Sequence, residues 1–292
     1  MIAMSANSQG GNARVSSLSQ MRIVTKYAFL NYFRARRFYV MLVVVLLISA
    51  LLTFVAAYYR PATFGFGTPS SQNPALTFYS AFWGSVPTLV VLLSVVFFGG
   101  DAISSEFQNK TGYFLIPNPL RRSVVYIGKW LAALGASTLI LAVFALISLA
   151  NGTYFFGASV PYQFVESLAF AWVYLVSALG LTFLFSSLFK TSIISILTTV
   201  MLFLIVFDII DTVASVVAGI EPWFSITYAG GIIANVLAVP FPLHSVTQAF
   251  GRRFTLTTFN APIPEALAIM AVYFVVSAAL GLWLFERKEF TS

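Results

Sequence analysis

The sequence predicts an all-α membrane protein in which six transmembrane helices form a bundle. Its composition is the first indication, since 59% of the 292 residues are hydrophobic and 9% are charged, with a mean hydropathy of +0.91. A soluble domain carries about a quarter charged residues, so this chain has too little polar surface to cover itself in water. The apolar segments also lack the alternation of barrel strands, which face lipid and lumen in turn. Helices are therefore the expected spanning elements.

Six segments are long and apolar enough to cross a bilayer. The hydrocarbon core is roughly 30 Å thick and a helix rises about 1.5 Å per residue, so a span needs about 20 mostly apolar residues. We expect spans at 38–59, 76–100, 124–150, 164–189, 193–219 and 266–285. They belong to one transmembrane domain over 19–292, and the tail over 1–18 has the Ser, Asn, Gly and Gln content of a disordered segment.

Residues 19–36 predict an amphipathic helix that lies in the membrane interface. Its apolar face is formed by Met21, Val24, Ala28 and Tyr32, with Phe29 nearby. Its polar part is basic and contains Arg22, Lys26, Arg34 and Arg36. The alternative is a frayed basic lead into the first span. The aromatic residues, which are enriched at interfacial depth, favour the helix.

Lys and Arg residues are divided unevenly between the two sides of the predicted bundle. Of the 16, only Arg60, Arg252 and Arg253 fall on one side. Because cytoplasmic flanks retain positive charge, the other side and both termini are expected in the cytoplasm, at the cell membrane. Anionic lipid headgroups are the natural counterpart of the net charge of +7. No nucleic-acid partner is expected, because the charges are dispersed along membrane borders.

No catalytic residue, cofactor site or metal site is expected in this chain. The absence of cysteine removes disulfides and thiolate metal sites. The one histidine, His244, has no nearby Cys or carboxylate in the sequence and is expected to be an ordinary loop residue. Gly128-Lys129 does not complete a phosphate-binding loop, because Ser123 replaces its first glycine and Trp130 follows the lysine. The chain is therefore not expected to hydrolyse ATP by itself.

A polar loop over 101–123 separates the second and third predicted spans. Its charged residues do not belong in hydrocarbon, so the loop is expected to protrude or to lie at the membrane border. Gly112 permits a sharp turn, and two prolines hold the chain extended before an arginine pair. A short helix over 111–116 would offer bulky side chains to a groove on a partner, namely Tyr113, Phe114 and Leu115. The alternative is a plain cytosolic loop with positive charge.

The residue order in and after this loop resembles that of type-2 exporter permeases of the ATP-binding-cassette superfamily. The matching residues are Glu106, Lys110-Thr111-Gly112, Leu115, Pro117, Pro119, Arg121-Arg122 and Gly128-Lys129. The resemblance extends to an N-terminal elbow helix, six spans, a long external stretch before the last span and a basic end over 285–290. One departure is that Lys110 and Thr111 precede Gly112, where Gly-Thr is the commoner order, which leaves the start of the docking helix open.

The resemblance implies a membrane subunit that pairs with separate ATPase subunits, which hold the ATP and Mg. It assigns the coupling of this chain to the ATPase to Glu106, Thr111, Gly112, Tyr113, Phe114, Leu115, Pro117, Arg121 and Arg122. The turn over 189–192 would be a lesser contact. Six spans are half of the usual twelve, so the resemblance implies a homodimer or a pair with a related permease. ATP-driven closure of the ATPases would then switch the central path by alternating access.

The external stretch over 220–264 is too long for a simple turn. It contains five prolines and an apolar run over 226–239 that is too short to span and suits a re-entrant or interfacial segment. The family resemblance implies an outer gate here. The alternative is a long surface loop folded over the bundle.

Asp208 and Asp211 interrupt the fifth predicted span, in its outer half. Three residues apart, they are expected to share one helical face. One interpretation is a polar lining for substrate, a cation or a gate, because intramembrane acids normally face protein or water. The other is a span that ends early, or acids satisfied by Ser and Thr of neighbouring helices.

Two other functional classes remain open from sequence alone. An ion-gradient-driven secondary transporter or a channel is expected to show inverted repeats, helices broken at mid-membrane or a ring of selective groups, and none is clear here. A membrane-embedded enzyme needs a convergent acid-base or metal set, and only the aspartate pair hints at one. The sequence does not identify a substrate.

Overall fold

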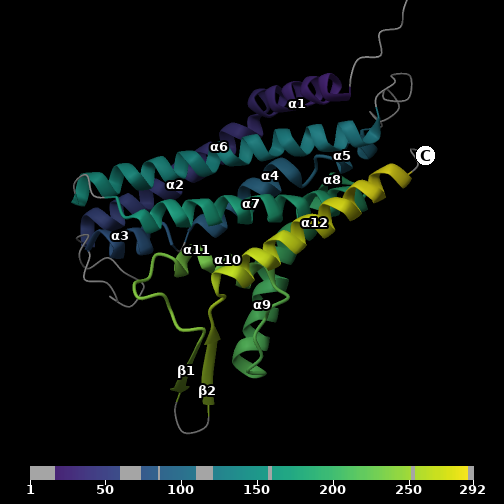
Figure 1. Cartoon of the computed structure of the whole chain (residues 1–292). Helices are drawn as coiled ribbons and strands as arrows, with labels where there is room; N and C mark the ends of the chain where they lie inside the picture. Colours follow the sequence, from purple (N-terminus) through teal and green to yellow (C-terminus); the bar gives the residue numbers. More distant parts are fainter. Residues whose placement is uncertain are drawn as a thin grey trace, which may run out of the picture.

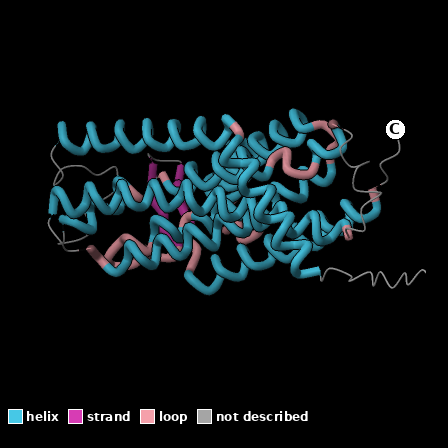
Figure 2. Tube along the Cα trace, turned by 90° about the horizontal axis from the view of Figure 1, so that it is seen from above, coloured by secondary structure: helices cyan, strands magenta, loops and turns pink. Residues whose placement is uncertain are grey.

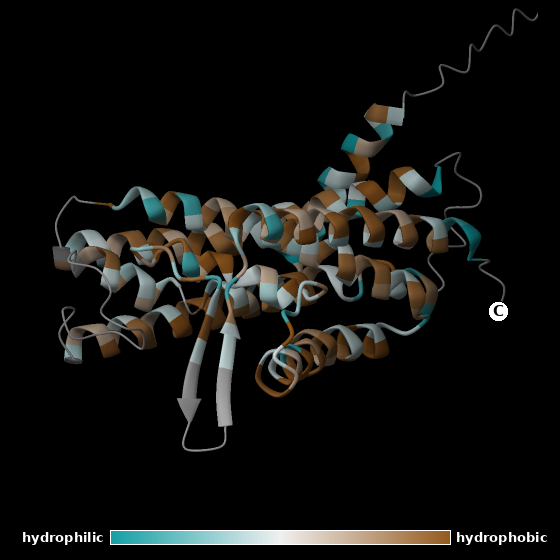
Figure 3. Ribbon diagram, turned by 60° about the horizontal axis from the view of Figure 1, so that its bottom comes forward, coloured by the Kyte–Doolittle hydropathy of each residue, from teal (hydrophilic) through white to brown (hydrophobic). Residues whose placement is uncertain are grey.

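The computed structural model of the chain describes residues 17–59, 74–84, 86–109, 121–156, 160–250 and 254–288. Helices make up nearly all of this part (Figures 1 and 2). Six helical segments are long and apolar enough to cross a membrane, and hydrophobic residues run along their length (Figure 3). This confirms the predicted all-α bundle. The predicted tail over 1–18 falls almost wholly outside the described residues.

The elements follow the order of the predicted spans. The first four spans and the helices beside them are α1 (Ser17–Arg34), α2 (Arg36–Tyr59), α3 (Pro74–Phe82), α4 (Pro87–Gly99), α5 (Ser104–Gln108), α6 (Arg122–Phe156) and α7 (Tyr162–Leu188). The fifth span is built from α8 (Ser192–Met201), a π-helical turn (Leu202–Val206), α9 (Phe207–Thr212) and a second π-helical turn (Val213–Val217). The external stretch holds α10 (Ile226–Gly230), α11 (Ile232–Asn235), β1 (Ser245–Phe250) and β2 (Phe254–Phe259), before α12 (Ile263–Arg287).

Helix α1 packs along the outside of α6 (Figure 1). Its half-buried side chains recur every three or four residues and include Met21, Val24, Ala28, Phe29 and Tyr32, the face that the sequence predicts. Glycines of α6 make this approach possible, because a Cβ on Gly128 would lie 2.7 Å from Val24 and one on Gly135 would lie 3.0 Å from Phe29. The helix ends at Arg34, and a bend at Ala35 leads directly into α2.

The second predicted span, expected as one segment over 76–100, consists of two helices. Between α3 and α4 the chain turns, and Pro87 occupies the first turn of α4. Proline has no N–H and its ring clashes with the carbonyl four residues earlier, so a continuous helix is disrupted here. Hydrogen bonds to other elements hold the turn in place. Trp83 Nε1 donates to Ser167 Oγ of α7 at 2.9 Å, and Ser167 Oγ in turn donates to the Ile233 carbonyl at 2.5 Å.

Helix α7 is the centre of the bundle and packs against α4, α6 and α12. Of its most apolar stretch, 56% is buried; the value is 71% for the second span, 22% for α2 and 17% for both the fifth span and α12. The latter three therefore turn most of their apolar surface outward, as lipid-facing helices do. Small residues bring α12 close to its neighbours, since a Cβ on Gly281 would lie 3.2 Å from the Leu184 Cα.

The external stretch contains a β-hairpin that the sequence analysis did not predict. β1 and β2 are antiparallel, with Ser245 opposite Phe259 and Phe250 opposite Phe254, and they project from the helices (Figures 1 and 3). Both strands are rich in Val, Thr and Phe, which favour strands. The apolar run over 226–239 forms the two short helices α10 and α11, which meet at Gly230 and Gly231.

Replacing Gly281 by alanine is expected to destabilise the fold. The new Cβ would lie 2.4 Å from the Tyr126 hydroxyl oxygen and 3.2 Å from the Leu184 Cα, so α12 must move away from α6 and α7. Overpacking of this kind costs about 1 to 3 kcal/mol, whereas Gly→Ala in an open helix stabilises by about 0.5 to 1 kcal/mol. The measurement is the thermal unfolding midpoint in detergent. Ala279→Leu, on the exposed face of α12, is the control, and an unchanged midpoint for Gly281→Ala would contradict the packing described.

Candidate functional site at the basic end of the bundle

Several chain segments that are far apart in sequence meet at one end of the bundle. Here α4 passes into α5, α6 begins, α7 turns into α8, and α12 ends (Figure 1). Lys and Arg side chains of α2, α6 and α12 gather at this end. We name it the basic end, and it contains the start of the loop that the sequence singles out.

The predicted loop over 101–123 begins with an ordered turn and the short helix α5. Buried serines of neighbouring helices hold this turn. Ser186 Oγ of α7 accepts hydrogen bonds from the Ile103 and Ser104 amides at 2.9 and 3.1 Å. Ser195 Oγ of α8 donates to the Gly100 carbonyl at 2.5 Å. Backbone groups that leave the helical pattern must be satisfied by protein at this depth, and these bonds therefore attach α5 to α7 and α8.

Two ion pairs attach the same segment to α2 and α6. Asp101, whose side chain is 8% exposed, pairs with Arg37 at the start of α2. Glu106 of α5 pairs with Lys129 of α6, and Lys129 Nζ also donates to the Ala102 carbonyl at 2.8 Å. The Lys129 and Glu106 side chains are only 18% and 20% exposed. An ion pair that is this sheltered from water contributes more to stability than a surface pair. Removing one partner leaves the other charge buried without a counter-charge.

Lys288, just past α12, closes the C-terminal end of α7. Its Nζ donates to the carbonyls of Ser187, Leu188 and Phe189 at 3.0, 3.1 and 3.1 Å. The last carbonyls of a helix have no partner within the helix and carry partial negative charge, so an ammonium group there is favourable. The same Nζ lies 4.4 Å from the ring centre of Phe107 in α5. Lys288 thus joins α5, α7 and α12.

Two further contacts complete the network. Arg122, at the start of α6, donates to the carbonyls of Glu286 and Lys288, both at 2.9 Å. The Ser192 amide at the start of α8 donates to Gln108 Oε1 of α5 at 2.8 Å. The short turn between α7 and α8 is therefore bonded directly to the end of α5.

The structure separates the predicted coupling residues into three groups. Glu106 and Arg122 are engaged inside the basic end, whereas Arg121 is exposed. Outside the described residues lie Thr111, Gly112, Tyr113, Phe114, Leu115 and Pro117. The sequence analysis missed Lys288, Ser186 and Ser195, because each acts through backbone atoms of distant segments. The sequence feature that could have pointed to them is that these serines and this lysine stand at the ends of apolar spans.

At the opposite end, Asp211 and Asp208 have different surroundings. Thr227 Oγ1, in α10, donates to Asp211 Oδ2 at 2.5 Å, and Asp208 is exposed on α9. The two carboxylates therefore have no shared partner among the described contacts, although they are three residues apart. The bond from Thr227 ties the fifth span to the external stretch.

His244 lies beside the carboxylate of Glu221, which is 23 residues away in sequence. Its Nε2 lies 3.1 Å from Glu221 Oε2, and its Nδ1 lies 3.1 Å from the Asn260 carbonyl oxygen. Glu221 also accepts a hydrogen bond from the Tyr228 hydroxyl, and burial together with this bond raises the pKa of Tyr228. These contacts join both sides of the hairpin to α10. Among the described residues no group of three His, Cys, Asp or Glu side chains is arranged to hold a metal ion.

Comparison with known proteins gives one family. A model of the ABC-2 family transporter proteins matches residues 22–290, which is nearly the whole chain. No curated protein matches. The matched region includes most of α1, all six spans and the basic end.

Lys288 is expected to react with amine-directed reagents at lower pH than an ordinary lysine. Burial, and then the charge of Lys190, lower the pKa of Lys288 from 10.5 to about 8. The folded protein thus releases this proton first, and the contribution of Lys288 to the free energy of unfolding rises with pH between about 8 and 10.5. Labelling followed by peptide mass spectrometry should give a midpoint near pH 8. Exposed Lys26 normalises the reagent, and a midpoint near 10.5 would contradict the placement of Lys288.

Thr227→Val is expected to destabilise the end of the bundle opposite the basic end. The valine has nearly the shape of threonine but removes the Thr227 hydrogen bond to the half-buried Asp211 carboxylate and leaves only the Ser225 hydroxyl beside it, which costs about 1 to 3 kcal/mol. The midpoint of thermal unfolding in detergent should fall, and Thr227→Ser, which keeps the hydroxyl, should restore it. Thr212→Val, at an exposed position of α9, is the matched control. Equal midpoints for Thr227→Val and Thr212→Val would show that the bond contributes nothing.

Proposed function

This chain belongs to the ABC-2 family of transporter proteins, and from that premise we propose that it forms the membrane-spanning half of an ATP-driven exporter. As a family member it is a multi-pass membrane subunit of an ABC transporter and works with an ABC ATPase subunit. Export, alternating access and ATP hydrolysis in separate subunits are the finer parts of the proposal. The observation that supports a coupling role is the bonding of α5 to α6, α7, α8 and the end of α12.

This bonding supports a mechanical role for α5. The turn before it is held by Ser186 and Ser195, and its charged and aromatic side chains contact Lys129 and Lys288. A push on the loop that follows α5 is therefore passed to α6, α7, α8 and α12 together. Packed helices shift between discrete arrangements as rigid elements, which suits a switch between inward and outward exposure.

The coupling residues divide into anchors and contacts in this proposal. Glu106 and Arg122 act as anchors, since both are bonded inside the basic end. Arg121 is exposed and is proposed to contact the ATPase, together with the loop over 111–117. The turn over 189–192 is the lesser contact. Because Ser192 is bonded to Gln108, this turn and α5 move as one unit.

The basic end is proposed to face the cytoplasm, with both chain ends, at the cell membrane. The support is the excess of Lys and Arg at this end, which is the distribution that cytoplasmic flanks retain. The second half of the transporter is proposed to be another copy of this chain or a related permease. The outward-facing apolar surfaces of α2, the fifth span and α12 leave room for such a partner as well as for lipid.

The external stretch is proposed to be the outer gate. It is fastened to three elements of the bundle: to α7 through Ser167 and Ile233, to α9 through Thr227 and Asp211, and to α12 through the Tyr273 hydroxyl, which donates to the Phe224 carbonyl at 2.6 Å. A tilt of these helices would move it. Asp211 has a gating role in this proposal because its bond to Thr227 connects the fifth span to the external stretch.

Copurification tests the proposed function. The tagged full-length chain, extracted from its native membrane, should retain a subunit with a nucleotide-binding P-loop, and the complex should hydrolyse ATP. In liposomes, transport of compounds from a panel should need ATP and that subunit. Transport by the purified chain alone, driven by an ion gradient, would instead show a secondary carrier.

Glu106→Gln is expected to uncouple the complex while leaving it assembled. The change removes the charge that holds Lys129, and losing a partner from a sheltered charged pair is worth about 1.5 to 3 kcal/mol, so stimulation of ATP hydrolysis by a transported compound should fall by about tenfold. Glu166→Gln, which removes an exposed carboxylate near the other end of α7, is the matched control. Unchanged stimulation in Glu106→Gln would contradict the assigned anchor.

A further inference from the structure

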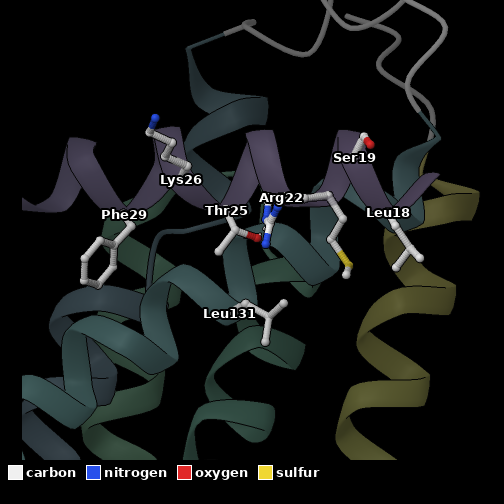
Figure 4. A pocket seen from close by; sticks show the side chains of 8 residues that line it. Leu18, Ser19, Arg22, Thr25, Lys26, Phe29 and Leu131 are labelled. Atoms are coloured by element: carbon white, nitrogen blue, oxygen red, sulfur yellow. Dashed lines mark hydrogen bonds between the residues drawn. The ribbon is translucent and has the colours of Figure 1, made fainter. Parts of the chain in front are cut away.

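A groove lies between α1 and α6, beside the basic end. It has a volume of about 590 Å³, within the range of pockets that hold small organic ligands. Its lining comes almost entirely from α1 and comprises Leu18, Ser19, Met21, Arg22, Thr25, Lys26, Phe29 and, from α6, Leu131. Figure 4 shows Leu18 and Phe29 pointing from α1 toward the bundle, whereas the Lys26 ammonium points away from it. The groove is therefore apolar on its inner side, with the Arg22 guanidinium beside Thr25 and the Lys26 ammonium at the rim that faces away from the bundle.

The positive charge of this rim has no acid to balance it within the groove. Arg22 and Lys26 are one helical turn apart, both are exposed, and no carboxylate is among the lining residues. The sequence contains no Asp or Glu before Asp101. A second groove beside α1 differs, because Lys129 in its lining is already paired with Glu106. The first groove thus offers two cations to an anion from outside.

The apolar side of the groove selects a ligand with a hydrocarbon part. Thr25 Oγ1 donates to the Met21 carbonyl at 2.8 Å, so this hydroxyl is already engaged within α1. Beyond Leu131, α6 continues with exposed apolar side chains, including Leu139 and Leu146, which are 39% and 64% exposed. An acyl chain that enters the groove would find apolar surface along α6. A free phosphate ion would leave this surface uncovered.

We propose that this groove binds one phospholipid with a net negative headgroup, taken from the leaflet at the basic end. Arg22 and Lys26 bind the headgroup phosphate, and one acyl chain lies against Phe29 and Leu131. Basic residues beside a membrane attract anionic lipids in proportion to their number. The bound lipid fills the space between α1 and α6. This site requires neither an ATPase partner nor transport, so it is testable apart from the proposed function.

Native mass spectrometry of the full-length chain in detergent tests the site. Phosphatidylglycerol is titrated against phosphatidylcholine and against inorganic phosphate. The double variant Arg22→Gln/Lys26→Gln should weaken phosphatidylglycerol binding by about tenfold or more, because two attracting charges are lost. Leu131→Trp, which fills the groove and keeps both charges, should also remove the bound lipid. The matched control is Arg34→Gln/Arg36→Gln, which removes two charges nearby that do not line this groove.

Three results would overturn the proposal. Equal losses in the charge variant and its control would show diffuse attraction by the whole basic segment. Unchanged phosphatidylglycerol binding in Leu131→Trp would place the lipid elsewhere. Binding of inorganic phosphate as tight as that of phosphatidylglycerol would make the ligand a soluble anion. Equal thermal midpoints of all variants establish that each is folded.

Discussion

The turn between α4 and α5 is buried within the protein and has to satisfy its backbone polar groups there, and the basic end is organised around this requirement. A helix bonds its own amides and carbonyls, but a turn exposes them, and each one left unpaired in an apolar setting costs several kcal/mol. Here Ser186 and Ser195 supply the missing partners. Because these serines belong to α7 and α8, satisfying the turn also joins three segments. The last carbonyls of α7 also lack partners within their helix, and Lys288 Nζ donates hydrogen bonds to them. Because Lys288 follows α12 and also contacts Phe107, it joins α12 to α5 as well.

Polar bonds at the two ends of the bundle differ in kind, and this difference bears on which end is rigid. At the basic end, two ion pairs, whose carboxylates are only 8% and 20% exposed, and cations on helix carbonyls connect five helices. At the other end, single hydroxyl bonds connect the external stretch to the bundle, as in the bond from Thr227 to Asp211. Hydrogen bonds with an ionised partner are stronger than neutral ones, and among the described contacts the basic end has more of them. The basic end is therefore suited to move as a block, and the external stretch is suited to open.

The sequence predicted the parts of this fold that the bilayer dictates. Span number and approximate position follow from hydrocarbon thickness, and the buried face of α1 follows from helical periodicity. The site was harder to predict, because it is built from backbone atoms of distant segments. Lys288 binds carbonyls a hundred residues away in sequence, and Glu221 contacts His244 across a separation of 23 residues. The break at Pro87 was visible as a proline in an apolar run, but its position depends on packing against Ser167.

The fifth span is the element that connects the two ends mechanically. At the basic end, the Ser192 amide is bonded to Gln108 of α5, and Ser195 is bonded to the turn before α5. At the other end, Asp211 is bonded to Thr227 in the external stretch. Between these points the span contains two π-helical turns, and little of its surface is buried by neighbouring helices. π-Helical turns interrupt the regular bonding of an α-helix and occur often at functional sites. In the proposed mechanism, a helix held at both ends and loosely packed between them would transmit a displacement of α5 to the external stretch without first disrupting the core around α7.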